Sequence, residues 1–186
     1  TIVLASMRRS VGELRHAHPC CTHFALLEHA DGAEWIVLHD RGARMPVMPV
    51  AEIPATFDGL ARYNVSNALH AIAAGYLSGI GVAAMRASLA RFRMSFEDTP
   101  GRMNFHDAGG LRFLVDYAHN PDGIAKLCEF VDRLEPGGRK LVAFSAPGYN
   151  PEAIIADTAR AAAGHFNAYV CYNRGKNCDQ GYFEVP

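Results

Sequence analysis

The sequence has 186 residues, of which 49% are hydrophobic and 20% are charged, and its formal net charge is −1. This is the composition of an ordinary soluble globular protein. The near-neutral charge does not favour a nucleic acid or an anionic membrane surface as a partner, and no apolar run approaches the roughly 20 residues of a membrane helix.

Cysteine usage points to a reducing compartment. The five cysteines have no regular spacing and their number is odd, which argues against a disulfide framework. We therefore expect a cytoplasmic protein, and the N-terminal TIVLASMRRS does not have the charge order of a signal peptide. The segment HAHPCCTH, residues 16–23, lacks the spacing of a structural zinc site, so we assign no metal ligands.

The first half of the sequence predicts a hairpin followed by two helices. Residues 22–38 contain two β-like runs around Asp31-Gly32, a pair typical of tight hairpin turns. The prolines that follow, from Pro46 to Pro54, indicate an edge segment or a loop. Apolar residues at spacings of three and four predict helices over residues 63–77 and 82–92.

The second half alternates strands with helices. A hairpin is expected around Gly109-Gly110, and further strands and helices follow in the order helix 121–134, strand 140–144, helix 151–163 and strand 168–172. This alternation predicts an α/β fold with a mostly parallel sheet covered on both faces. The main domain boundary is placed in the linker 95–101.

The segment DYAHNP, residues 116–121, is the leading candidate for a site. Here an apolar strand ends in polar side chains that are unfavourable unless they have partners, and Pro121 opens a helix. Helix N-termini favour anions, Asp116 can accept from ribose hydroxyls, and a neutral His119 can donate to a phosphoryl oxygen. The alternative is that Asn120 or Asp116 only caps the helix and that His119 packs.

Three further segments carry polar groups suited to a nucleotide. Arg102, after Gly101, offers a guanidinium that suits phosphate, although most surface arginines bind nothing specific. Asn64 and Asn67 share one helix face and could read a purine edge, or could be a helix cap and an exposed amide. The segment SAPGYNPEA, residues 145–153, lies at the same predicted sheet edge as DYAHNP and could approach a phosphate or an acyl substrate, or is a plain strand–helix turn.

In this order, the motifs resemble the Mur ligase family. The matching motifs are PATFDG at 54–59, Asn64-x-x-Asn67-Ala-Leu-x-Ala71, Gly101-Arg102, and DYAHNPDG at 116–123. The resemblance covers about residues 33–175. It implies a Mur-ligase C-terminal, Rossmann-like domain over residues 95–186, truncated at its end. The tail of a central, ATP-binding domain, a β-hairpin plus helices, would precede it over residues 1–94.

The resemblance also implies an activity and its substrates. A carboxylate would take the γ-phosphoryl group of ATP, and an amine would then displace phosphate from the acyl phosphate. The expected partners are ATP with Mg²⁺, an acidic poly-aspartate primer, arginine as the amino acid, and further copies of the full-length enzyme. Neither a nucleic acid nor a membrane is expected as a partner.

The family's functional residues carry over to the matching positions of this sequence. The resemblance places Asn64 and Asn67 by the adenine, Arg102 at the ribose and phosphates, Asp116 on the ribose, and Tyr117 near the base.

It also assigns a catalytic role to His119 and Asn120, close to the phosphate.

Two departures from the family pattern limit these expectations. No Gly-x-x-x-x-Gly-Lys-Ser/Thr occurs, so the phosphate loop and most magnesium ligands are expected outside this chain. Gly148-Tyr149-Asn150 stands where relatives tend to have Gly-Asp-Arg. We expect these residues alone not to catalyse ligation. Two alternatives remain: a non-catalytic module that binds nucleotide or polymer, or another Mur-type ligase such as a folylpolyglutamate synthetase.

Overall fold

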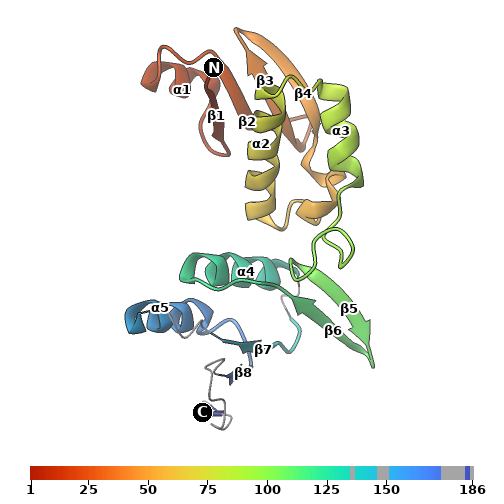
Figure 1. Cartoon of the computed structure of the whole chain (residues 1–186), viewed down its shortest axis with the longest axis vertical. Coiled ribbons are helices and arrows are strands. Elements are labelled where there is room, and N and C mark those ends of the chain that lie inside the picture. The colour runs from red at the N-terminus through yellow and green to blue at the C-terminus, as the bar shows by residue number, and fades with distance from the viewer. Residues whose placement is uncertain (135–136, 146–150, 173–182, 185–186) are drawn as a thin grey trace. The chain divides into compact units, whose positions relative to one another are not determined.

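The computed structural model describes residues 1–134, 137–145, 151–172 and 183–184 (Figure 1). The chain forms two compact units, Thr1–Val115 and Asp116–Pro186. The domain boundary predicted at residue 95 stays a prediction, because the two compact units are defined only by the contacts between their residues. Within the described residues, no helix has the length and apolar character needed to cross a membrane.

The first unit is built around a four-stranded sheet with strand order β1-β2-β3-β4. β1 pairs with β2 in parallel, and the other pairs are antiparallel. The strands are β1 (Val3–Ser6), β2 (His23–Ala30), β3 (Ala33–Asp40) and β4 (Ala43–Pro49). Helices α1 (Val11–Ala17), α2 (Arg62–Leu77) and α3 (Val82–Arg91), two single-turn 3₁₀ segments (Val50–Glu52 and Pro54–Thr56) and the hairpin β5 (Asn104–Ala108) and β6 (Leu111–Val115) complete the unit.

Local turn chemistry explains the first hairpin. Asp31 and Gly32 both have positive φ, 52° and 75°, as a two-residue hairpin turn of this kind requires. The predicted hairpin is confirmed, since β2 and β3 pair from His23–Asp40 to Ala30–Ala33. The proline-containing segment is the edge strand β4, where missing N–H groups are tolerated.

Helix α2 covers the sheet with its apolar face. Val65, Leu69 and Ile72 are buried in one cluster with Ile36 and Leu38 of β3. The helices predicted over residues 63–77 and 82–92 are both confirmed within one residue at each end. The apolar spacing of three and four therefore reports the face that packs on the sheet.

The pair formed by Glu34 of β3 and Arg62 of α2 gives the first unit a defined pH dependence. Nη1 and Nη2 of Arg62 donate to the two carboxylate oxygens of Glu34 at 2.5 and 2.9 Å. These hydrogen bonds lower the pKa of Glu34 below its ordinary value of 4.5. The stabilisation is therefore present above pH 4.5 and is lost as the pH falls through the lowered folded-state pKa.

Replacing Glu34 with Gln should lower the free energy of unfolding by about 1 kcal/mol at pH 7, because the charge-assisted pair is lost. The difference from the wild type should shrink as the pH falls below 4.5, measured by thermal unfolding at each pH. Glu97→Gln, at an exposed position, is the control and should change little. A Glu34→Gln deficit that persists at the lowest pH would contradict this.

The second unit alternates helices with strands. It contains α4 (Pro121–Leu134), β7 (Leu141–Phe144), α5 (Glu152–Ala162), β8 (Ala168–Cys171) and β9 (Phe183–Glu184). β7 and β8 pair in parallel across α5, and β9 adds to β8 in antiparallel. The predicted α/β class is confirmed, with parallel pairing across the helix crossover.

Helices α4 and α5 share a small core with the strands of this unit. Ile124, Cys128 and Ala162 are buried together, with Phe144 and Tyr169 packed against them. Burial raises the pKa of the Cys128 thiol to about 11, and its side chain packs in this core.

Candidate functional site

The loop Asp116–Asn120 is ordered by its own hydrogen bonds. Asp116 Oδ1 accepts from the N–H of Ala118 at 2.8 Å, which closes a short turn after β6. Asn120 Oδ1 accepts from the N–H of Gly123 at 2.8 Å and so caps the N-terminus of α4. A Cβ at Gly123 would lie 3.2 Å from that oxygen, so glycine leaves room for the cap. The capping alternative is therefore realised for Asn120, whose amide nitrogen remains the group that it can present to a ligand.

The two rings in this loop are exposed. Tyr117 is 54% exposed, and its ring centroid lies 5.2 Å from that of His119. His119 is likewise exposed, so the alternative that it packs is not realised. Both rings are accessible to a ligand.

The hydrogen bond of His119 constrains its chemistry. Nδ1 lies 3.1 Å from the carbonyl oxygen of Tyr117, which can only accept, so Nδ1 carries the proton. The neutral ring then presents Nε2 as an acceptor, and only the imidazolium form donates outward at Nε2. Donation from His119 to a phosphoryl oxygen stays a prediction.

Asn64 and Asn67 lie one turn apart on α2 and have different surroundings. Asn64 is 7% exposed, and its Nδ2 donates to the carbonyl oxygen of Ala55 at 2.7 Å. Asn67 is exposed, and its Nδ2 donates to Asn64 Oδ1 at 3.1 Å. Asn64 thus anchors the helix and orients Asn67, whose side chain is exposed. The adenine role expected for this pair stays a prediction.

Substitutions should distinguish the roles of the two asparagines. Asn64→Ala should lower the free energy of unfolding by about 2 kcal/mol, because the buried carbonyl of Ala55 loses its donor. Asn67→Ala should leave stability within about 0.5 kcal/mol of the wild type and raise the KM for ATP about fivefold, the loss of one hydrogen bond. Denaturant unfolding and ATP kinetics measure the two effects. A stability loss equal for both variants would contradict this division of roles.

Arg102 lies in a turn that a buried asparagine holds. Asn104 is fully buried, and its Oδ1 accepts from the N–H of Gly101 at 2.6 Å. Its Nδ2 donates to the carbonyl oxygens of Thr99 at 3.1 Å and Arg102 at 2.9 Å. The backbone on both sides of Arg102 is therefore fixed, with positive φ at Gly101 (75°) and Met103 (50°), while Arg102 itself is exposed.

The predicted site residues fall in both units. Asn64 and Asn67 are hydrogen-bonded to each other in the first unit, which also holds Arg102. The second unit holds the exposed or half-buried side chains from Asp116 to Asn120 in one loop. The loop residues 146–150, with Gly148-Tyr149-Asn150, lie outside the described residues. Sequence reasoning missed Asn104, although an Asn two residues after Gly-Arg in a turn was a visible signal.

The segment HAHPCCTH does not gather metal ligands in one place. Cys20 is exposed, Cys21 is buried beside Leu14 and Phe24, and His23 Nε2 lies 3.1 Å from Asp40 Oδ1. Within the described part of the chain, no group of three or more His, Cys, Asp or Glu side chains could hold a metal ion.

Comparison with known proteins shows what the second half of the chain resembles. Residues 101–181 match the family model described as Mur ligase, glutamate ligase domain. This part of the chain is therefore similar to the glutamate ligase domain of the Mur ligases. The chain is 34% identical over 118 residues to the cyanophycin synthetase of Synechocystis sp.. The matched stretch covers 63% of this chain and 13% of that protein. For the cyanophycin synthetase of Crocosphaera subtropica, the identity is 38% over 96 residues, covering 52% of this chain and 11% of that protein.

Other Mur ligase relatives and a solved structure agree with this. The UDP-N-acetylmuramyl-tripeptide synthetase of Deinococcus radiodurans is 34% identical over 109 residues, 56% of this chain and 21% of that protein. The crystal structure of folylpolyglutamate synthase from Thermotoga maritima has the same fold, with a TM-score of 0.55 at 14% identity, over 96% of this chain and 43% of that one. The resemblance to the Mur ligases and to cyanophycin synthetase is confirmed, and this chain spans 13% or less of the two cyanophycin synthetases.

Proposed function

We propose that the protein is an ATP-dependent carbon–nitrogen ligase that joins arginine to the side-chain carboxylates of a poly-aspartate backbone. Its relatives are named as synthetases and ligases, and the cyanophycin synthetases among them support the choice of substrate. The observation that carries the nucleotide assignment is the ordered loop Asp116–Asn120, which exposes Tyr117, His119 and Asn120 in front of α4.

The reaction proceeds through an acyl phosphate. A carboxylate oxygen of the primer attacks the γ-phosphorus, and ADP leaves. The α-amine of arginine then attacks the acyl carbon, loses a proton, and displaces phosphate together with one former carboxylate oxygen. Both steps need cationic and N–H groups that hold phosphate oxygens in place.

The residues of this chain supply binding and charge for these steps. Arg102 holds phosphate oxygens with its guanidinium, and Asp116 accepts from the ribose hydroxyls. Asn67 binds the adenine edge. His119, in its imidazolium form, and the amide nitrogen of Asn120 donate to the phosphoryl group near the N-terminus of α4.

Magnesium supplies charge neutralisation on the phosphates when it is bound with ATP. Within the described residues, no group of three or more His, Cys, Asp or Glu side chains could hold a metal ion. We assign the magnesium ligands and the phosphate loop to parts of the protein outside this chain. The proposed setting is the cytoplasm, with several copies of the full-length enzyme assembled.

ADP release tests this function. The full-length protein is given ATP and a poly-aspartate primer, with arginine, glutamate or meso-diaminopimelate as the amine. We expect ADP only when primer and arginine are both present. Release that requires a different amino acid would indicate another Mur-type ligase. ATP binding with no release under any condition would indicate a non-catalytic module.

A further inference from the structure

The loop that joins the 3₁₀ segment Pro54–Thr56 to α2 has an unusual backbone. Three consecutive residues, Phe57, Asp58 and Gly59, have positive φ, at 51°, 55° and 83°. Glycine adopts this left-handed region without strain, whereas a bulky residue such as phenylalanine is an outlier there. Strained backbone of this kind persists only where its surroundings fix it, and it clusters at functional sites. A role for the ring of Phe57 would account for phenylalanine at a position that suits glycine.

Thr56 fixes this loop from inside. It is fully buried, and its Oγ1 donates to the carbonyl oxygens of Val50 and Ile53, each 2.8 Å away. The same Oγ1 accepts from the N–H of Gly59 at 3.2 Å, and the carbonyl oxygen of Thr56 accepts from the N–H of Ala61 at 2.9 Å. These bonds hold the backbone on both sides of the strained residues, so their conformation is kept.

The ring of Phe57 contacts the first strand of the hairpin formed by β5 and β6. Its centroid lies 5.4 Å from that of Phe105 with an interplanar angle of 67°, the edge-to-face arrangement that aromatic pairs favour. Both rings are half-buried. Phe105 directly follows Asn104, which binds the backbone on both sides of Arg102. The contact therefore joins the loop before α2 to the turn that carries Arg102.

The same loop is tied to the two asparagines of α2. Asn64 donates to the carbonyl oxygen of Ala55, two residues before Phe57, and accepts from Asn67. A continuous series of contacts therefore runs from Asn67 through the two phenylalanine rings to the turn of Arg102, all within the first unit. The proposed adenine ligand lies at one end of this series, and the proposed phosphate ligand lies at the other.

We propose that Phe57 is a positioning residue for the nucleotide. Its contact with Phe105 sets the spacing between the amide of Asn67 and the turn of Arg102, so that one ATP molecule engages both groups at once. The inference rests on the proposed function, from which it takes the adenine and phosphate assignments. It adds a residue that acts through the protein, without contact with the nucleotide, and it accounts for the strained phenylalanine.

Three ligands separate positioning from direct contact: the non-hydrolysable analogue AMP-PNP with Mg²⁺, adenosine, and inorganic triphosphate. Isothermal titration calorimetry on the full-length protein gives the Kd of each. Phe57→Ala should raise the Kd of AMP-PNP about tenfold and leave the other two within about twofold, because only a ligand that spans both ends senses their spacing. Weakening of adenosine or triphosphate as large as that of AMP-PNP would place the damage at one end and overturn the positioning role.

Substitution on the strand side tests the contact itself. Phe105→Ala should weaken AMP-PNP as much as Phe57→Ala does, and the double variant should be no weaker than either, since both changes break one contact. The matched control is Phe113→Ala, which removes an exposed ring from the same hairpin at a position that pairs with His106. It should leave the Kd unchanged. Additive losses in the double variant, or an equal loss in Phe113→Ala, would overturn the proposal.

Two further substitutions separate the ring from the backbone. Phe57→Gly suits the positive φ but lacks the ring, so it should unfold at a higher temperature than Phe57→Ala and still bind AMP-PNP about tenfold more weakly than the wild type. Phe57→Tyr keeps the ring and should bind AMP-PNP within about twofold of the wild type. Wild-type affinity in the Phe57→Gly variant would overturn the role of the ring.

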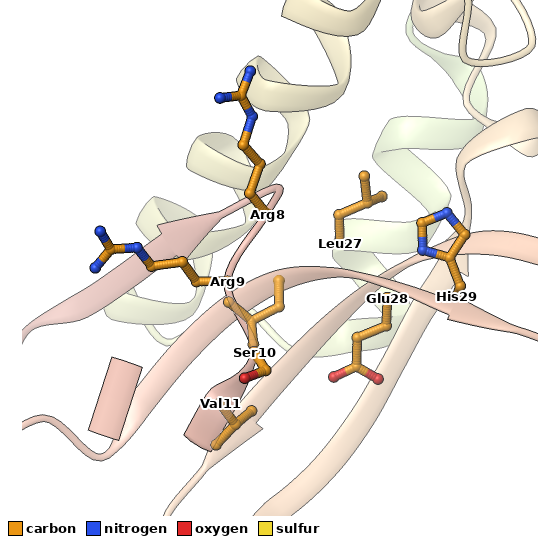
Figure 2. Close-up of a pocket in the computed structure, with 8 residues that line it drawn as sticks. Arg8, Arg9, Ser10, Val11, Leu27, Glu28 and His29 are labelled. Atoms are coloured by element: carbon orange, nitrogen blue, oxygen red, sulfur yellow. The ribbon is translucent and has the colours of Figure 1, made fainter. Parts of the chain in front are cut away.

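A cavity of about 330 Å³ elsewhere in the first unit does not interfere with these measurements (Figure 2). It is lined by residues 8–11, after β1, and by residues 26–29 of β2. Figure 2 shows the guanidinium groups of Arg8 and Arg9 beside it, and such groups attract phosphate. The lining shares no residue with the contacts between Asn67 and Arg102, so phosphate bound there should be unaffected by the substitutions of Phe57 and Phe105.

The binding measurements decide the positioning role separately from the ligase reaction. AMP-PNP binding by the wild type with an unchanged Kd in every variant would overturn the positioning role alone. If the variants behave as predicted but no amine supports ADP release, the proposed reaction fails and the positioning role stands. No binding of AMP-PNP by the wild type would overturn both.

Discussion

Replacing Arg102 with alanine is expected to lower kcat/KM for ATP about a hundredfold in the full-length protein, the scale for losing one preorganised donor to a phosphoryl group. Asn104 fixes the backbone on both sides of Arg102, so the turn that carries this side chain is formed before ATP binds. Arg102→Lys should recover only part of the loss, because an ammonium lacks the paired N–H geometry.

The control for this experiment is Arg93→Ala, which removes an exposed arginine that follows α3. It should leave the ATP kinetics unchanged. Asp116→Ala provides a second arm and should raise the KM for ATP about tenfold through loss of the ribose contacts. If both Arg102→Ala and Asp116→Ala keep the wild-type KM and turnover, the nucleotide assignment is wrong.

Replacing Asn104 with alanine is expected to lower the free energy of unfolding by about 3 kcal/mol. The change removes three hydrogen bonds from a fully buried side chain, and the carbonyl oxygen of Thr99 keeps only the N–H of Arg102 as a donor. Denaturant unfolding measures the loss. Asn104→Asp keeps the acceptor for Gly101 but sets a buried carboxylate oxygen against the carbonyl oxygens of Thr99 and Arg102, so it should be no more stable than Asn104→Ala.

For Asn104 we also predict a kinetic effect, which a purely structural role would not produce. Below the unfolding temperature, Asn104→Ala should raise the KM for ATP more than it lowers kcat, because the turn that carries Arg102 loses its fixed geometry. Asn67→Ala, at an exposed position on α2, serves as the stability control. A destabilised Asn104→Ala protein with wild-type ATP kinetics would show that the turn does not position a nucleotide ligand.

The elements that sequence predicts correctly are those specified by adjacent residues. The hairpin around Asp31-Gly32 follows from two positive φ values that this pair tolerates, and helix α2 follows from its buried apolar face. β1 and α1 are different, because β1 gains its pairing from a strand 20 residues later. The start of α1 was nonetheless readable: Ser10 and Glu13 form a capping box.

The candidate site likewise combines features specified by adjacent residues with features that depend on how the chain packs. The cap by Asn120 and the turn at Asp116 are local hydrogen bonds, and sequence reasoning already named capping as an alternative. The burial of Asn64 and Asn104 depends on how the chain packs, so a sequence cannot show which amide turns inward. The tautomer of His119 likewise depends on a carbonyl oxygen that only the folded loop brings within 3.1 Å.

The central claim is ligation through an acyl phosphate, and isotope transfer tests it most directly. The full-length protein would receive ATP, arginine and a poly-aspartate primer with ¹⁸O in its side-chain carboxylates, and the released phosphate would be analysed by mass spectrometry. We predict ADP, with one ¹⁸O in each phosphate, since the displaced phosphate carries one former carboxylate oxygen. Amide formation with no ¹⁸O in phosphate, or with AMP as the product, would contradict the account.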